Sequence, residues 1–149
     1  MFHVAEGGWE VHKYIVLKSF IVLMADELGI YIVDENDLET HATFAMQIPG
    51  TYNTISHDVK WQPRYIDRIT RLYQRDKIHS NTSIFMWSLG NEAGGYNNTD
   101  AMAEYLHQHS DLPVHYESNV HCKRLAYDVG SEMYPSVQMV HDVGAHGRC

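Results

Sequence analysis

Cysteine and long hydrophobic runs are scarce in this sequence. The 149 residues include two cysteines, Cys122 and Cys149, which lie too far apart for a zinc motif and are too few for a disulfide framework. The most hydrophobic stretch, residues 14–24, contains Lys18 and is shorter than the roughly 20 residues that cross a bilayer. The first residues lack the basic start and apolar run of a secretory signal. We therefore expect a cytoplasmic protein with reduced thiols and no membrane partner.

Positive charge is also scarce. The chain has 11 Lys and Arg residues against 19 Asp and Glu residues, which gives a formal net charge of -8. This balance argues against a nucleic-acid partner and against an anionic-membrane surface. The hydrophobic share of 44% and the charged share of 20% are typical of a globular domain, and the length allows one domain with a core.

The first clear elements are a helix followed by a strand. Apolar residues at helical spacing predict a helix that ends at residue 28, where Gly29 fits a C-terminal cap, whereas residues 14–17 could be a strand or the start of that helix. A compact apolar strand is expected at residues 30–33, followed by the acidic residues 34–37. The apolar stripe of the helix consists of Phe20, Leu23, Met24 and Leu28.

The rest of the chain alternates in the same way. Residues 42–58 read as a long loop, and residues 61–77 predict an amphipathic helix whose charged residues form a solvated outer face. A second helix is expected from residues 97–100 to about 109, with short strands at 114–117 and 126–129. Strands that alternate with helices predict a parallel α/β sheet.

The central strand of this sheet is expected at residues 83–89, and it ends in Gly90, Asn91 and Glu92. Ligands of α/β proteins bind at the carboxyl ends of the strands, so Glu92 is a candidate proton donor. Alternatively, Glu92 stabilises the start of the next helix, as acidic residues commonly do. The spacing alone does not decide between these two interpretations.

A second candidate pair follows the first strand. If the chain stays extended, Glu39 and His41 project to the same side, since residues two apart in a strand share a face. A carboxylate and an imidazole directed at one point can bind a metal or transfer a proton. The alternative is an exposed glutamate and a loop histidine without a function.

The segment Trp-Ser-Leu-Gly-Asn-Glu-Ala-Gly, residues 87–94, resembles the acid/base segment of the β-galactosidases of glycoside hydrolase family 2. That resemblance implies a (β/α)8 TIM barrel with the Asn-Glu pair after its fourth strand. It also implies that Glu92 is the general acid/base of a retaining hydrolase and that Asn91 binds the sugar, a β-galactoside such as lactose.

Two further segments carry the resemblance. Residues 34–41, Asp-Glu-Asn-Asp-Leu-Glu-Thr-His, are similar to the family segment that binds magnesium, which implies that Glu39, His41 and Glu92 are ligands of one Mg²⁺. Manganese suits the same ligands. The pair Met133 and Tyr134 is similar to the family pair whose tyrosine hydrogen-bonds the nucleophilic carboxylate, which implies a place in the substrate site.

The resemblance covers residues 25–134 and implies barrel strands three to six. It leaves residues 1–24 poorly matched and defines a partial barrel domain at 25–136, with an irregular tail at 137–149. A complete barrel needs roughly 250 residues. The family's nucleophilic glutamate follows a later strand, so we expect the isolated chain to be inactive and the full-length enzyme to be a homo-oligomer.

Two alternatives stay open at this point. The chain could be a non-catalytic remnant that binds a metal or a sugar. It could also belong to a β-glucuronidase or β-mannosidase of the same family, but those enzymes usually place proline after the glutamate, where this chain has Ala93.

Overall fold

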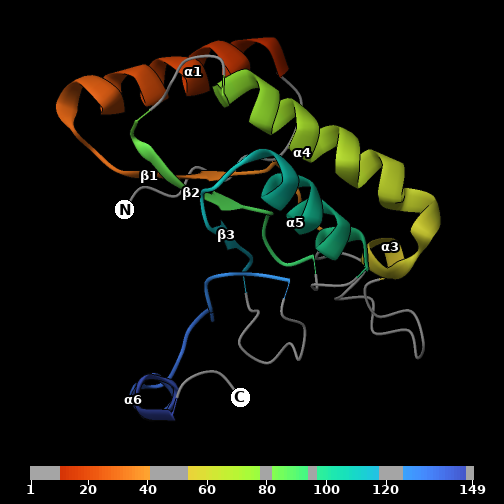
Figure 1. Ribbon diagram of the computed structural model, residues 1–149, viewed down its shortest axis with the longest axis vertical. Coiled ribbons are helices and arrows are strands. Elements are labelled where there is room, and N and C mark those ends of the chain that lie inside the picture. The colour runs from red at the N-terminus through yellow and green to blue at the C-terminus, as the bar shows by residue number, and fades with distance from the viewer. Residues whose placement is uncertain (1–10, 41–53, 78–81, 94–96, 118–125, 147–149) are drawn as a thin grey trace.

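The computed structural model describes residues 11–40, 54–77, 82–93, 97–117 and 126–146 (Figure 1). Its centre is a parallel sheet of three strands in the order β1-β2-β3. The strands are β1 (Ile32–Glu35), β2 (Ile84–Ser88) and β3 (Val114–His115). Strands that follow one another in the chain are therefore neighbours in the sheet, which is the arrangement of a (β/α)8 barrel.

The pairing of residues extends this order beyond β3. Glu35 lies opposite Ser88, and Ser88 lies opposite His115. An isolated parallel bridge joins His115 to Val129, so the segment around residue 129 follows β3 as a fourth element. The predicted parallel α/β architecture is confirmed, and its strand order is that of a partial (β/α)8 barrel.

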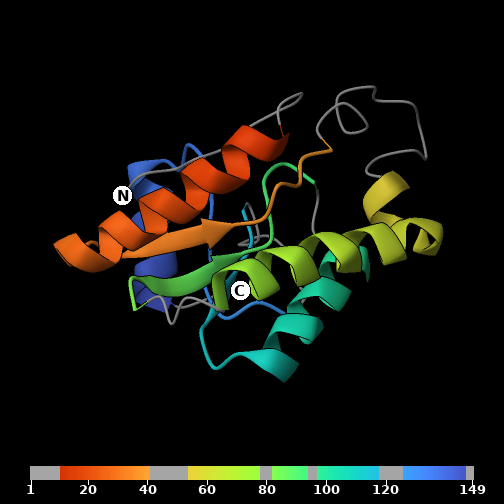
Figure 2. The same ribbon diagram turned by 90° about the horizontal axis from the view of Figure 1, so that it is seen from above.

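Helices alternate with the strands. They are α1 (Val11–Leu28), the short α3 (Thr54–His57) and the 3-10 turn η1 (Val59–Trp61), α4 (Gln62–Lys77), α5 (Asn97–His109) and α6 (Val137–His146). Helices α1 and α4 lie above the strands in Figure 1, and Figure 2 shows both running alongside β1 and β2. Helix α4 packs against α5, while α6 lies apart from them below the sheet in Figure 1.

The core lies between the sheet and these helices. It is built mainly from apolar residues of α4, α5 and β2, and it extends to β3 and to the segment after it. Helix α4 contributes the buried face that the sequence predicts. The fully buried side chains include Ile69, Leu89, Met102, Leu106, Val114 and Tyr116.

Helix α1 ends where the sequence predicts, but its apolar stripe is not buried. Gly29 has φ 68°, and the Ile30 amide donates to the Ala25 carbonyl at 2.9 Å, which is a Schellman cap. The stripe is exposed among the described residues, since Phe20 is 57% and Leu28 is 64% exposed. Val22 and Ala25 are buried in its place. Residues 14–17 are helical.

Strand β1 begins two residues later than predicted and contains two acidic residues, of which Asp34 faces the core. Asp34 is buried, and its Oδ2 lies 3.5 Å from an Arg75 nitrogen. Arg75 Nε also donates to Asp76 Oδ1 at 2.8 Å, and Asp76 is buried. The prediction of a fully solvated charged face on α4 is therefore wrong at its C-terminal end. There the charges form an internal ion-pair network between α4 and β1.

Two other predictions need correction. The segment expected to be an irregular tail contains the helix α6. The loop expected at residues 42–58 ends in α3, and its part at residues 42–53 lies outside the described residues. Within the described part of the chain, no helix is both long and apolar enough to span a membrane.

Candidate functional site

The three strands each place one polar side chain at the same level near their carboxyl ends. The Ser88 hydroxyl on β2 donates to Oε2 of Glu35 on β1 at 2.8 Å, and His115 Nδ1 on β3 lies 3.1 Å from the same hydroxyl. The serine has a single proton and gives it to Glu35, so Nδ1 of His115 must donate. This row therefore fixes the imidazole in the tautomer that is protonated at Nδ1.

Directly beyond this row lies the rim, by which we mean residues 36–39, 89–93 and 116–117. Gly90 in the rim has φ 134°, and a Cβ atom built there would lie 2.5 Å from the Leu38 carbonyl oxygen. The same carbonyl accepts a hydrogen bond from the Asn91 amide at 2.9 Å. Only glycine allows this close approach between the two chain segments.

The approach at Gly90 brings two predicted metal ligands to neighbouring backbone positions. Glu39 and Asn91 form an isolated parallel bridge, so Glu39 lies beside the residue that precedes Glu92. Glu39 is exposed and Glu92 is partly buried. The third predicted ligand, His41, lies outside the described residues. Among the residues that the structure does describe, no group of three or more His, Cys, Asp or Glu side chains forms a metal site.

Glu92 has a strained backbone that two side chains of the β3 segment hold in place. Its φ is 42°, which is the left-handed region that residues with a Cβ atom rarely adopt. The Glu92 amide donates to Glu117 Oε2 at 3.0 Å, and the Ala93 amide donates to the Tyr116 hydroxyl at 2.7 Å. From α3, the Ser56 hydroxyl donates to the Ala93 carbonyl. The backbone around Glu92 is therefore fixed from two sides.

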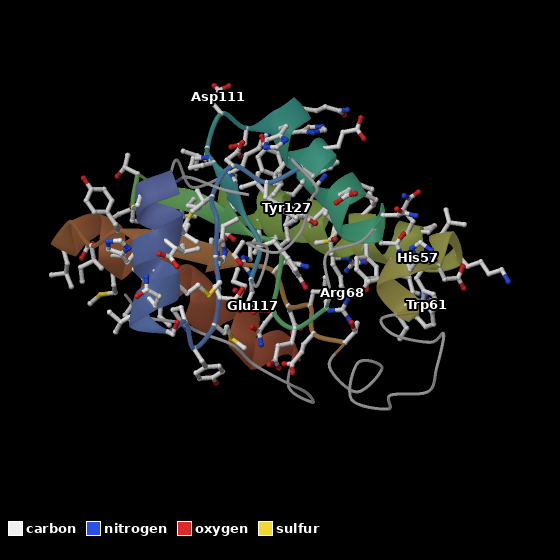
Figure 3. The ribbon with its side chains drawn as sticks, turned by 90° about the horizontal axis from the view of Figure 1, so that it is seen from below. His57, Trp61, Arg68, Asp111, Glu117 and Tyr127 are labelled. Atoms are coloured by element: carbon white, nitrogen blue, oxygen red, sulfur yellow. The ribbon has the colours of Figure 1, made fainter. Side chains whose placement is uncertain are left out.

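Glu117 is the most deeply buried carboxylate at the rim, with 7% of its surface exposed. Burial raises the pKa of its carboxyl, and the hydrogen bond from the Glu92 amide opposes that rise. The negative charges of Glu92, Glu132 and Glu35 raise the pKa further. Figure 3 shows Glu117 near the centre of the molecule, in contrast to the peripheral Asp111. Four carboxyl groups therefore interact electrostatically at this end of the sheet.

The remaining predicted site residues lie in different surroundings. Asn91 is partly buried in the rim, next to Glu92. Met133 is partly buried, whereas Tyr134 is 92% exposed and has φ 51°. The Tyr134 ring therefore makes almost no contact with the described part of the chain.

Two rim residues, Glu117 and Gly90, carry no local sequence pattern that assigns them a role. Glu117 follows a short strand, which is the signal that identified Glu92, but its partner amide lies 25 residues away in the sequence. Gly90 precedes the Asn-Glu pair, yet its close contact is with Leu38. A local sequence pattern does not contain either of these contacts.

Comparison with known proteins identifies the family. Residues 18–147 match the family described as "Glycosyl hydrolases family 2, TIM barrel domain", which is a wider range than the predicted 25–136. The "Beta-galactosidase" of Pectobacterium atrosepticum is 39% identical over 115 residues, or 76% of this chain and 10% of that protein. The "Beta-galactosidase" of Streptococcus thermophilus is 35% identical over 116 residues, or 74% of this chain and 11% of that protein.

A third relative is more similar over a shorter region. The "Beta-galactosidase" of Arthrobacter sp. (strain B7) is 44% identical over 97 residues, which cover 64% of this chain and 9% of the relative. The chain therefore spans about a tenth of the length of these curated relatives. Since the family match extends over most of the sequence and the strand order agrees with it, the chain belongs to glycosyl hydrolase family 2 and is part of its TIM barrel domain.

Proposed function

We propose that this chain is the acid/base part of a retaining β-galactosidase, which releases terminal β-D-galactose from galactosides such as lactose. The observation that carries the proposal is the position of Glu92. It follows the central strand β2 in the rim, and Glu39 and Glu117 approach it from the two neighbouring strand segments. The matched relatives are named as β-galactosidases, which supports galactose as the sugar.

In this mechanism the Glu92 carboxyl gives its proton to the departing glycosidic oxygen. A second carboxylate, roughly 5 Å away, attacks the anomeric carbon and forms a glycosyl-enzyme. Glu92 then takes a proton from the water that releases the sugar. We propose that the second carboxylate comes from a part of the barrel outside residues 25–134. Asn91 would bind the sugar beside Glu92, and Met133 and Tyr134 would complete the substrate site in the full-length enzyme.

The residues of the rim are compatible with a divalent cation. Glu39 and Glu92 supply carboxylate oxygens, which Mg²⁺ and Mn²⁺ prefer as ligands. The backbone of Glu39 lies beside that of Asn91, the residue before Glu92. The negative charges that act on Glu117 add a field that attracts a cation. We propose that Glu39, His41 and Glu92 hold the ion. Its positive charge would offset the neighbouring carboxylates and orient Glu92.

The test is a chimeric enzyme in which residues 25–134 replace the matching segment of an intact β-galactosidase, such as the Arthrobacter relative. We expect the chimera to hydrolyse a chromogenic β-galactoside. Glu92→Gln should reduce kcat/KM on lactose by about 10²–10⁴-fold, since general acid/base catalysis contributes that much. The isolated chain, assayed in parallel, should release no product because the covalent step requires the second carboxylate.

Glu27→Gln is the matched control, because Glu27 is an exposed glutamate on α1 far from the rim. This variant should keep the activity of the chimera. Unchanged kcat/KM in Glu92→Gln would reject the acid/base assignment. Faster hydrolysis of a β-glucuronide than of a β-galactoside by the chimera would reject galactose as the sugar.

A further inference from the structure

A buried carboxylate beside other carboxylates requires an explanation. Glu117 is 7% exposed, and the charges of Glu92, Glu132 and Glu35 all disfavour its ionised form. Its Oε1 atom is buried and has no hydrogen-bond partner among the described residues. Such an environment destabilises a carboxylate, so the folded core gains little from placing one there. The contact of its other oxygen, Oε2, indicates a role.

That contact is to the backbone of the proposed acid/base residue. Oε2 of Glu117 accepts a hydrogen bond from the Glu92 amide at 3.0 Å. The amide belongs to a residue with φ 42°, a conformation that persists only when its surroundings enforce it. The direction in which the Glu92 side chain leaves the backbone depends on this φ.

We propose that Glu117 is a positioning residue that holds Glu92 in its left-handed conformation and thereby directs the Glu92 carboxyl at the leaving-group oxygen. This inference rests on the proposed acid/base function of Glu92. Glu117 itself does not touch the substrate. Its side chain acts through one hydrogen bond, so the property that matters is an acceptor oxygen at the correct distance from the amide, and the negative charge is secondary.

The structure offers a matched contact at the opposite end of β2. There Asp26 Oδ1 accepts a hydrogen bond from the Ser83 amide at 2.6 Å. A carboxylate therefore also binds a backbone amide at the start of the strand. Ser83 has no positive φ, and it lies a full strand length from Glu92. Removing the Asp26 acceptor therefore serves as a control for the general loss of a strand-end hydrogen bond.

The experiment compares two substrates in the chimeric enzyme. Lactose has a poor leaving group that needs a proton, whereas the leaving group of 2,4-dinitrophenyl β-galactoside departs without one. The ratio kcat/KM reports the formation of the glycosyl-enzyme for both substrates. A misplaced Glu92 carboxyl should therefore lower kcat/KM on lactose much more than kcat/KM on the dinitrophenyl substrate. Glu117→Leu should reduce kcat/KM on lactose by about 10–100-fold, as expected for a small misplacement of a catalytic group, and should change the dinitrophenyl substrate little.

Two conservative variants separate geometry from charge. Glu117→Gln keeps an acceptor oxygen at the same reach and should restore kcat/KM on lactose to near the original value. Glu117→Asp keeps the charge but is one methylene shorter, so it should share the selective defect. The opposite pattern, in which Glu117→Asp is active and Glu117→Gln is defective, would overturn the proposal. So would an equal loss on both substrates in Glu117→Leu and Glu117→Asp, or no loss in either.

The outcomes also distinguish this inference from the proposed function. Glu92→Gln must itself show the selective loss on lactose, because otherwise the acid/base assignment fails. If Glu92→Gln shows that loss and the Glu117 variants do not, only the positioning role is rejected. Asp26→Leu should give the same ratio between the two substrates as the unmodified chimera, and a selective loss on lactose in this control would also overturn the positioning role.

Discussion

The two ends of strand β2 are held by the same kind of contact but differ in backbone conformation. At its start, the Asp26 carboxylate accepts a hydrogen bond from the Ser83 amide at 2.6 Å. Beyond its end, the Glu117 carboxylate accepts a hydrogen bond from the Glu92 amide at 3.0 Å. At the start Ser83 has no positive φ, whereas beyond the end Gly90 has φ 134° and Glu92 has φ 42°.

This difference separates stability from function within one strand. A hydrogen bond to an ordinary backbone stabilises the fold and nothing else. A hydrogen bond to a strained backbone also determines where a side chain points, and strained residues cluster at functional sites. The same division holds for the barrel fold in general, where catalytic residues lie at the carboxyl ends of the strands. Substitutions at matched positions of the two ends should therefore have different consequences.

Among the substitutions that test this contrast between the two ends, Gly90→Ala should have the largest effect in the chimeric enzyme. The new Cβ would lie 2.5 Å from the Leu38 oxygen and 2.8 Å from the Leu38 Cβ, so the two chain segments must move apart. Backbone strain should cost about 1–3 kcal/mol. Displacing Glu39 from Asn91 should also lower kcat/KM on lactose by about 10²-fold, as a 1 Å misplacement can. Kinetics and thermal unfolding measure the two effects, and unchanged activity would contradict the role given to this contact.

A smaller effect is expected for Gly29→Ala at the opposite end of the sheet. Gly29 has φ 68°, but a Cβ built there meets no atom within 4 Å. The left-handed conformation alone should cost about 1–2 kcal/mol, so the melting temperature should fall slightly. Since nothing in the rim moves, kcat/KM on lactose should stay unchanged. Loss of activity at this position would remove the contrast between the two ends.

Local patterns in the sequence predicted the features that depend on neighbours in the chain. The helix at α4, the cap at Gly29 and the position of Glu92 after a buried strand are of this kind. Each depends on spacing within a few turns of helix or along one strand. The parallel order of the strands followed from their alternation with helices.

Features that depend on distant partners were not predictable in the same way. Asp34 can be buried in a strand because Arg75, 41 positions later, pairs with it. The apolar stripe of α1 is exposed although its spacing is that of a buried face, because burial depends on what else packs there. Helix α6 is short, contains Gly144 and has the exposed residues Val137 and Val140, so its sequence carries a weak helical pattern.

The smallest effect should be that of Asp26→Asn, and it should depend on pH. Burial pushes the pKa of the Asp26 carboxyl up, but the hydrogen bonds from Ser83 and Thr82 outweigh burial and hold the pKa below its ordinary value of 3.8. A carboxyl whose pKa is lowered by folding stabilises the folded state above the ordinary pKa and loses that contribution as pH falls through the lowered value. The melting temperature of Asp26→Asn should therefore lie below that of the unmodified chimera by a constant amount from neutral pH to about 3.8, and the gap should close at lower pH.

Asp111→Asn, on the exposed turn before β3, serves as the control, and kcat/KM on lactose should be unchanged in both variants. A gap that widens below pH 3.8 would contradict the assigned direction of the shift, because it would mean that folding raises the pKa of this carboxyl.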